Sequence, residues 1–233
     1  MAELASAITY FVVFLFSTTL HEAAHAWVAL LGGDRTAYHG GQVTLDPRPH
    51  VRREPFGMFV LPLLTALVSG WPLGFASAPY DPRWAQRFPN RAAVMALAGP
   101  AANLLLVLLA ALLLRAGAAF GVFEAPDSVR FGQLAASQAG DWWAGAAQML
   151  SAFFSVNLLL ALLNLLPFPP LDGSGALPLV LSPEAGRRYQ ELVWSTPALA
   201  WIGLLVAWRL TDVLFDPIFV GAVNLVYPGV TYS

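Results

Sequence analysis

The chain has 233 residues, of which 58% are hydrophobic and 11% are charged, and its formal net charge at pH 7 is −2. Soluble domains carry about 25% charged residues, so this composition, with a mean hydropathy of +0.63, indicates a protein that crosses a membrane several times. The small negative charge argues against a nucleic-acid partner. The absence of cysteine excludes disulfides and thiolate metal ligands, which leaves His, Asp and Glu to bind any metal.

Long apolar runs predict four membrane-spanning helices, because a helix needs about 20 residues to cross a hydrocarbon core of about 30 Å. Runs of this length occur at 4–31, 92–114, 144–166 and 197–215. A fifth run, 56–78, is interrupted by prolines and glycines, and the apolar tail 217–226 is too short to span. We therefore expect an all-α polytopic membrane protein. Its single domain would cover 1–233, with a core at about 4–176 and accessory membrane segments at about 196–228.

The first apolar run contains the motif His-Glu-x-x-His at residues 21–25. On a helix, His21 and His25 share one face, so both imidazoles can bind one tetrahedral Zn²⁺. In soluble proteases with this motif the glutamate takes a proton from the metal-bound water, which predicts the same role for Glu22. The alternative is a chance pentapeptide on an ordinary helix. Charged groups in hydrocarbon cost roughly 2.5 kcal/mol or more each, which favours the functional interpretation.

A catalytic zinc normally has three protein ligands, so one ligand remains to be found. Few His or Asp residues outside the motif are candidates; they are His39, His50, Asp141, Asp172, Asp212 and Asp216. Asp172 follows a segment with three prolines, which ends a membrane helix and frees the chain to bend inward. Alternatively, Asp172 caps the next helix from an interfacial loop.

Three motifs lie in separate apolar segments: His21-Glu-Ala-Ala-His25, Gly99-Pro-Ala-Ala-Asn103 and Asn164-Leu-Leu-Pro-Phe-Pro-Pro-Leu-Asp172-Gly173. Together they resemble the site-2 protease family of intramembrane zinc metalloproteases, in a compact form without PDZ or CBS modules. The resemblance covers about 4–176. It implies one Zn²⁺ bound by His21, His25 and Asp172, with Glu22 as the general base.

The same resemblance implies that Asn164 positions the substrate or stabilises an oxyanion, which suits an amide N–H donor. A packing hydrogen bond between helices is the alternative for Asn164. We expect Asn157, seven residues earlier on the same face, to act in packing. Gly99 and Asn103 are expected to support the site by close helix approach and an interhelical hydrogen bond.

The arginines predict how the chain lies in the membrane. If zinc joins Asp172 to the first helix, the metal lies near the face that carries the loop 32–55. Nine arginines then fall on that face and only Arg115 and Arg130 near the other, so the metal's face is cytoplasmic by the positive-inside rule. The run 56–78 begins and ends there, so we expect it to be re-entrant. The segments 42–45 and 75–78 have strand character and could offer backbone edges to an unwound substrate; the alternative is that both are loops.

These features predict a zinc endopeptidase in the cell's inner membrane. It would hydrolyse peptide bonds in transmembrane segments of membrane-anchored proteins, near the cytoplasmic face. Besides the substrate and the lipid bilayer, separate membrane-protein regulators are expected partners, since the PDZ and CBS modules are missing. The alternative is a non-proteolytic transporter or scaffold with a buried metal or ion site. A transporter would not need Glu22. Arg209, in the last span, is expected to pair with Asp212 or to extend to the interface.

Overall fold

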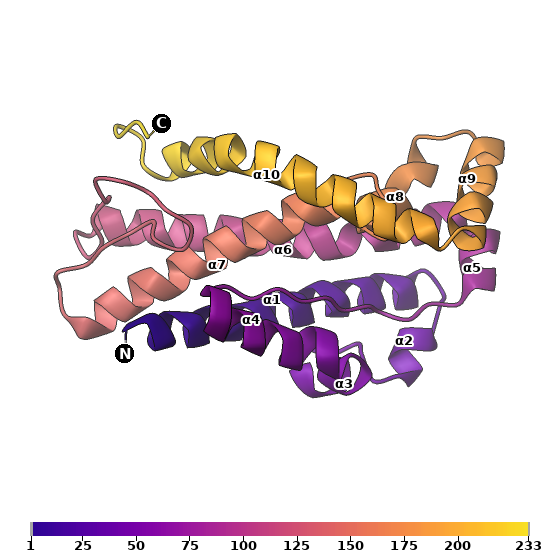
Figure 1. Ribbon diagram of the computed structural model, residues 1–233, viewed down its shortest axis with the longest axis horizontal. Helices are drawn as coiled ribbons and strands as arrows, with labels where there is room; N and C mark the ends of the chain where they lie inside the picture. The colour runs from indigo at the N-terminus through magenta and orange to yellow at the C-terminus, as the bar shows by residue number, and fades with distance from the viewer. Residues whose placement is uncertain (1, 233) are drawn as a thin grey trace.

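The computed structural model describes residues 2–232, and within them the chain is a bundle of helices without a β-strand (Figure 1). Four helices are long and apolar enough to cross a membrane: α1 (Ala2–Leu31), α6 (Pro89–Ala119), α7 (Asp141–Leu165) and α10 (Ala198–Val226). The predicted all-α polytopic fold is confirmed.

Short helices gather toward one end of the bundle, opposite the N-terminus (Figure 1). They are α2 (Thr36–His39), α3 (Pro47–Arg53), α5 (Pro82–Arg87), α8 (Asp172–Ala176), the 3-10 turn η2 (Leu177–Leu179) and α9 (Pro183–Ser195). Asp46, Asp81 and Ser182 begin α3, α5 and α9 by accepting a backbone N–H, the usual role of Asp and Ser at a helix start. This end therefore carries well-defined loops rather than a separate domain.

The last helix is longer than the sequence predicted. We expected a span at 197–215 and a separate tail at 217–226, but α10 continues through Pro217 to Val226. A proline removes one backbone hydrogen bond, which favours a helix end. Here the burial of residues beyond Pro217 outweighs this loss. Phe219, Val223 and Val226 pack in a core cluster with Leu114 of α6 and with several residues of α7.

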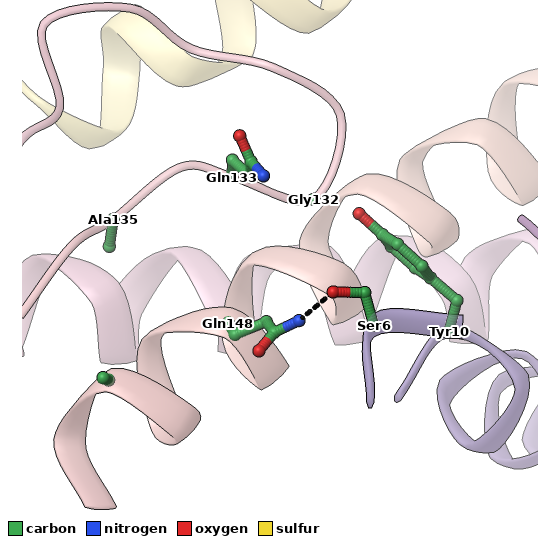
Figure 2. A pocket seen from close by; sticks show the side chains of 7 residues that line it. Ser6, Tyr10, Gly132, Gln133, Ala135 and Gln148 are labelled. Atoms are coloured by element: carbon green, nitrogen blue, oxygen red, sulfur yellow. Dashed lines mark hydrogen bonds between the residues drawn. The ribbon is translucent and has the colours of Figure 1, made fainter. Parts of the chain in front are cut away.

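The loop between α6 and α7 folds back over the N-terminal half of α1. Gly132 N donates to Ser155 Oγ at 2.9 Å, and Leu134 N donates to Ser151 Oγ at 3.0 Å, which fastens the loop to α7. A cavity of about 370 Å³ remains beside it (Figure 2), where Gln148 Nε2 donates to Ser6 Oγ at 2.8 Å. This end of the bundle is thereby closed by loop backbone.

The run 56–78 enters and leaves the bundle at one end. The π-helix η1 (Phe56–Val60) and α4 (Leu61–Ser69) lead inward, and an extended chain at 72–81 returns alongside α1 (Figure 1). Five and nine residues reach no more than about 21 Å, which is short of a bilayer core. Ser77 Oγ donates to Glu54 Oε1 at 2.9 Å, and Arg53 Nε donates to Ser77 O at 3.2 Å, so the two ends of the run meet.

Two glycines allow this return. A Cβ at Gly57 would collide with the Phe75 carbonyl, and a Cβ at Gly74 would collide with the Gly57 carbonyl. Neither 42–45 nor 75–78 forms a strand, so the loop alternative holds for both segments. Hydrogen bonds from Gln42 N to Ala37 O and from Asp46 N to Thr44 Oγ1 bend the first segment, and the second is extended chain without a strand partner.

Cysteine labelling tests this path, because the chain has no cysteine of its own. Arg53 and Arg83 flank the run and are exposed, so Arg53→Cys and Arg83→Cys should react with a membrane-impermeant maleimide from the same face. Ser128→Cys, in the loop between α6 and α7, is the control and should react from the opposite face. Labelling of positions 53 and 83 from opposite faces would show that the run spans the membrane.

Candidate metal centre

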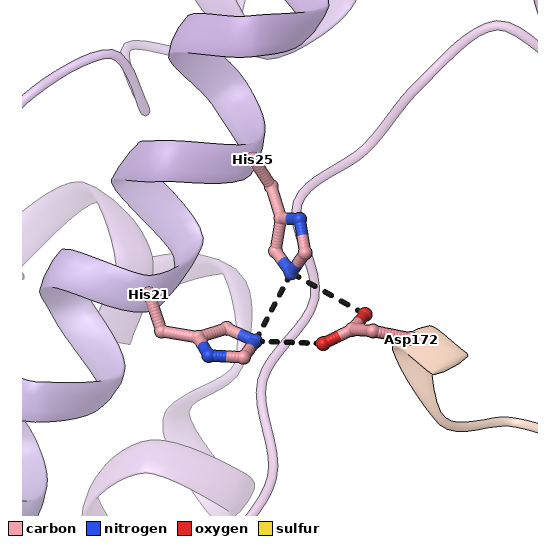
Figure 3. Close-up of side chains that lie close together, drawn as sticks. All are labelled: His21, His25 and Asp172. Atoms are coloured by element: carbon pink, nitrogen blue, oxygen red, sulfur yellow. Dashed lines mark hydrogen bonds and ion pairs between the residues drawn. The ribbon is translucent and has the colours of Figure 1, made fainter. Parts of the chain in front are cut away.

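His21 and His25 lie one turn apart on α1 and direct their Nε2 atoms at one point (Figure 3). The two Nε2 atoms are 3.0 Å apart. Each residue is only 6% exposed. The four-residue spacing places both imidazoles on one helix face, as expected.

Asp172, the first residue of α8, supplies the third side of the cluster. Its Oδ2 lies 3.0 Å from His21 Nε2 and its Oδ1 lies 3.3 Å from His25 Nε2. The carboxylate accepts no backbone hydrogen bond, so the helix-capping alternative does not describe it.

Close glycine contacts carry Asp172 back toward α1. A Cβ at Gly173 would collide with the carbonyls of Leu165 and Leu166, where α7 ends. A Cβ at Gly203, on α10, would collide with the carbonyl of Pro169. The proline-containing loop is thus pressed between the end of α7 and α10, and it turns Asp172 inward.

Hydrogen bonds to the outer ring nitrogens determine the tautomer of each histidine. His25 Nδ1 lies 2.8 Å from Met95 O, and a carbonyl can only accept, so Nδ1 carries the proton. His21 Nδ1 lies 2.6 Å from Asn103 Oδ1. If Nδ1 donates in both rings, both Nε2 atoms are bare lone pairs that face Asp172.

A buried amide chain fixes the direction of the Asn103 bond. Asn157 Nδ2 donates to Phe153 O at 2.8 Å and to Ser17 Oγ at 2.9 Å, so Asn157 presents its oxygen to Asn103. Asn103 Nδ2 donates to that oxygen at 2.8 Å, which leaves Asn103 Oδ1 for His21. Asn157 thus packs α7 against α1 and α6, as expected, and it also orients Asn103 toward His21. The signal that we underused was polar side chains deep inside two apolar spans.

The donor set fits a zinc ion. Two neutral imidazoles and a carboxylate direct lone pairs at one another, and a proton can bridge only two of these three groups at a time. Tetrahedral zinc with bonds of about 2.0–2.1 Å places its ligand atoms about 3.3 Å apart, close to the 3.0–3.3 Å found here. Asp172 Oδ2 is also buried without a hydrogen-bond donor, as a metal ligand can be.

Gly99 of α6 forms the wall behind this cluster. A Cβ at Gly99 would collide with Nε2 of both His21 and His25. Only a residue without a side chain leaves the space into which the lone pairs point. The glycine of the Gly99-Pro-Ala-Ala-Asn103 motif therefore contributes room, and its asparagine contributes orientation.

Glu22 and Asn164 do not belong to the cluster of His21, His25 and Asp172. Glu22 follows His21 on α1, is 5% exposed, and has no hydrogen bond to another of the described residues. Asn164, one residue before the end of α7, donates from Nδ2 to Leu160 O at 3.0 Å. That bond lies within its own helix, so the interhelical packing alternative does not describe Asn164.

The other candidate ligands lie elsewhere. His50 is buried in α3, with Nε2 3.1 Å from Thr44 O, and His39 is exposed on α2. Within residues 2–232, the one group of three His, Asp or Glu side chains spaced to hold a metal is His21, His25 and Asp172. The four apolar helices and this cluster define a membrane-embedded protein with a zinc-type metal site.

Comparison with known proteins identifies the family. The profile described as Peptidase family M50 matches residues 9–204. YwhC of Bacillus subtilis is 36% identical over 221 residues, which cover 91% of this chain and 90% of YwhC. Rip2 of Mycolicibacterium smegmatis is 33% identical over 192 residues, which cover 82% of this chain and 62% of Rip2. Both relatives are named as candidate zinc metalloproteases, and no solved structure is significantly similar to the chain.

The chain therefore belongs to peptidase family M50, and it is an intramembrane zinc protease.

Gly99→Ala should lower the zinc content of the purified protein well below one ion per chain, because the new methyl group would occupy the space beside both Nε2 atoms. Gly145→Ala is the matched control, since Gly145 lies in a membrane helix with open space around it. Elemental analysis of both variants measures the effect. A full zinc complement in Gly99→Ala would place the metal elsewhere.

Proposed function

We propose that His21, His25 and Asp172 are the zinc ligands and that Glu22 is the general base, in the manner of His-Glu-x-x-His proteases. The observation that carries the proposal is the convergence of three side chains, whose donor atoms approach one another at 3.0–3.3 Å, with Glu22 buried on the same helix as the two histidines. The donor set matches the two-histidine, one-carboxylate pattern of catalytic zinc sites.

The proposed reaction is hydrolysis of a peptide bond. When bound, zinc supplies Lewis acidity toward the scissile carbonyl and the attacking water. Glu22 accepts the proton that the water loses as the new C–O bond forms, and it then delivers this proton to the leaving nitrogen as the C–N bond breaks. The apolar helices around the site strengthen these electrostatic interactions.

Asn164 is proposed to position the substrate or to stabilise the oxyanion. Its Nδ2 uses one hydrogen for Leu160 O, and the second is available to a carbonyl oxygen. An amide donor suits this task because it needs no change of protonation.

The extended chain 72–81 is proposed to hold the substrate unwound. A helical peptide bond is shielded by its own hydrogen bonding, so the substrate must be extended when it is cut. The backbone N–H and C=O groups of Ala76 and Ala78 have no hydrogen-bond partner among the described residues. They are therefore free to pair with a strand. The chain runs alongside α1, the helix that carries both histidines (Figure 1).

The metal is proposed to lie toward the cytoplasmic side of the inner membrane. The helices α2, α3, α5 and α9 and their loops lie at the metal's end, and the sequence there is rich in arginine. By the positive-inside rule, such an end faces the cytoplasm. The proposed substrates are transmembrane segments of membrane-anchored proteins, and separate membrane proteins are the proposed regulators.

Two substitutions separate the proposed base from a proposed ligand. Glu22→Gln should retain zinc and lose nearly all cleavage of a co-expressed membrane-anchored reporter, because the amide cannot accept the proton. Asp172→Ala should lose both zinc and cleavage. Glu184→Gln, on the exposed side of α9, is the control and should retain both. Cleavage by Glu22→Gln would contradict the proposed role of Glu22 as the general base.

A further inference from the structure

A second cavity, of about 580 Å³, lies between α1, α7, α10 and the turn after α4. Along α7 its lining runs from Val156 to Leu163, so it ends one residue before Asn164. On α1 it reaches Phe14, which is seven residues and about 10 Å before His21. The cavity therefore leads from the middle of the bundle toward the metal site.

Aromatic rings form one continuous wall of this cavity. Trp71, in the turn after α4, has its ring centre 6.0 Å from that of Phe131 and 6.4 Å from that of Trp208. Phe131 is 5.8 Å from Phe215. Tyr10 holds Phe131 in place, because its hydroxyl donates to Phe131 O at 3.1 Å. The wall thus joins four segments that are distant in the sequence.

Two carboxylates line the same cavity. Asp212 and Asp216 lie four residues apart on α10, on the face that also carries Trp208 and Phe215. They stand near the middle of a helix that is long and apolar enough to span a membrane. Within residues 2–232 neither forms an ion pair, and the expected pairing of Arg209 with Asp212 is absent. Because ionisable groups at membrane depth are costly, two such groups facing a cavity indicate a ligand.

We propose that this cavity binds a basic side chain, Lys or Arg, of the substrate's transmembrane segment. A cation there would lie between the carboxylates and the faces of the tryptophan and phenylalanine rings, which attract positive charge. The apolar lining would cover the neighbouring part of the segment. This inference rests on the proposed function, because it names a feature of the substrate of that site.

The position of the cavity sets where the basic residue belongs. On α1 the cavity lining ends at Phe14, about 10 Å from His21. The bound cation would therefore lie about 10 Å or more from the scissile bond, on the side opposite the metal's face of the membrane. Substrates would then be distinguished by a single charge at one depth, in addition to an apolar sequence. A water passage to the metal is the competing use of the cavity, and it predicts no preference for charge.

Photo-crosslinking of synthetic peptides tests the proposal. The full chain with Glu22→Gln, which would not consume the peptide, is placed in phosphatidylcholine nanodiscs with a Leu/Ala transmembrane peptide. The peptide carries one Lys, norleucine or Glu, scanned along its length. We expect the Lys peptide to be captured about tenfold more than the norleucine peptide at one depth, and the Glu peptide least, as for close charge pairs in other interfaces.

Asp212→Asn with Asp216→Asn should remove this preference while zinc content stays unchanged. Asp141→Asn is the matched control, since Asp141 is an exposed acid on α7 that does not line the cavity. Equal capture of the Lys and norleucine peptides would overturn the proposal, and so would a preference that survives the double substitution. Capture of the peptide does not require hydrolysis. If the wild-type protein cleaved no peptide, that failure would count against the proposed function, and the capture preference would still test the cation site.

Discussion

Electrostatic repulsion among three lone pairs governs the centre of this molecule. Two imidazole nitrogens and a carboxylate approach within 3.0–3.3 Å of one another in a largely buried cluster. A cation among the three groups would relieve this repulsion. The helices that bring the groups together come from distant parts of the sequence, so binding of such a cation and assembly of α1, α6 and α8 would depend on one another.

The rest of the core is arranged to maintain this contact. Asn103 and Asn157 hold His21 in one tautomer through a buried chain of amides that ends on Ser17 of the same helix that carries His21. Gly99 leaves room for the ion, and Gly173 lets the loop after α7 turn inward. Polar groups of this kind in a membrane protein must find partners inside the protein, which explains why the hydrogen bonds form a continuous chain. The same requirement makes the unpaired Asp212 and Asp216 unusual.

Local sequence predicted the parts of the structure that depend on local chemistry. The spans followed from apolar length, and the placement of His21 beside His25 followed from their spacing. The prolines before Asp172 indicated that the chain bends there. The failures came from tertiary contacts: α10 continues through Pro217 because residues beyond it are buried, and 75–78 has no strand to pair with. The bond between Asn103 and Asn157 joins positions 54 residues apart, and no local pattern encodes such a contact.

X-ray absorption at the zinc K edge, on the purified full chain in detergent, tests most directly whether a zinc ion lies among His21, His25 and Asp172. We expect about one zinc per chain, with the multiple-scattering signature of two imidazoles, oxygen neighbours at about 2.0–2.2 Å and no sulfur. A protein that folds without stoichiometric metal, or a zinc spectrum that lacks the two imidazoles, would contradict the central claim that a bound cation holds His21, His25 and Asp172 together.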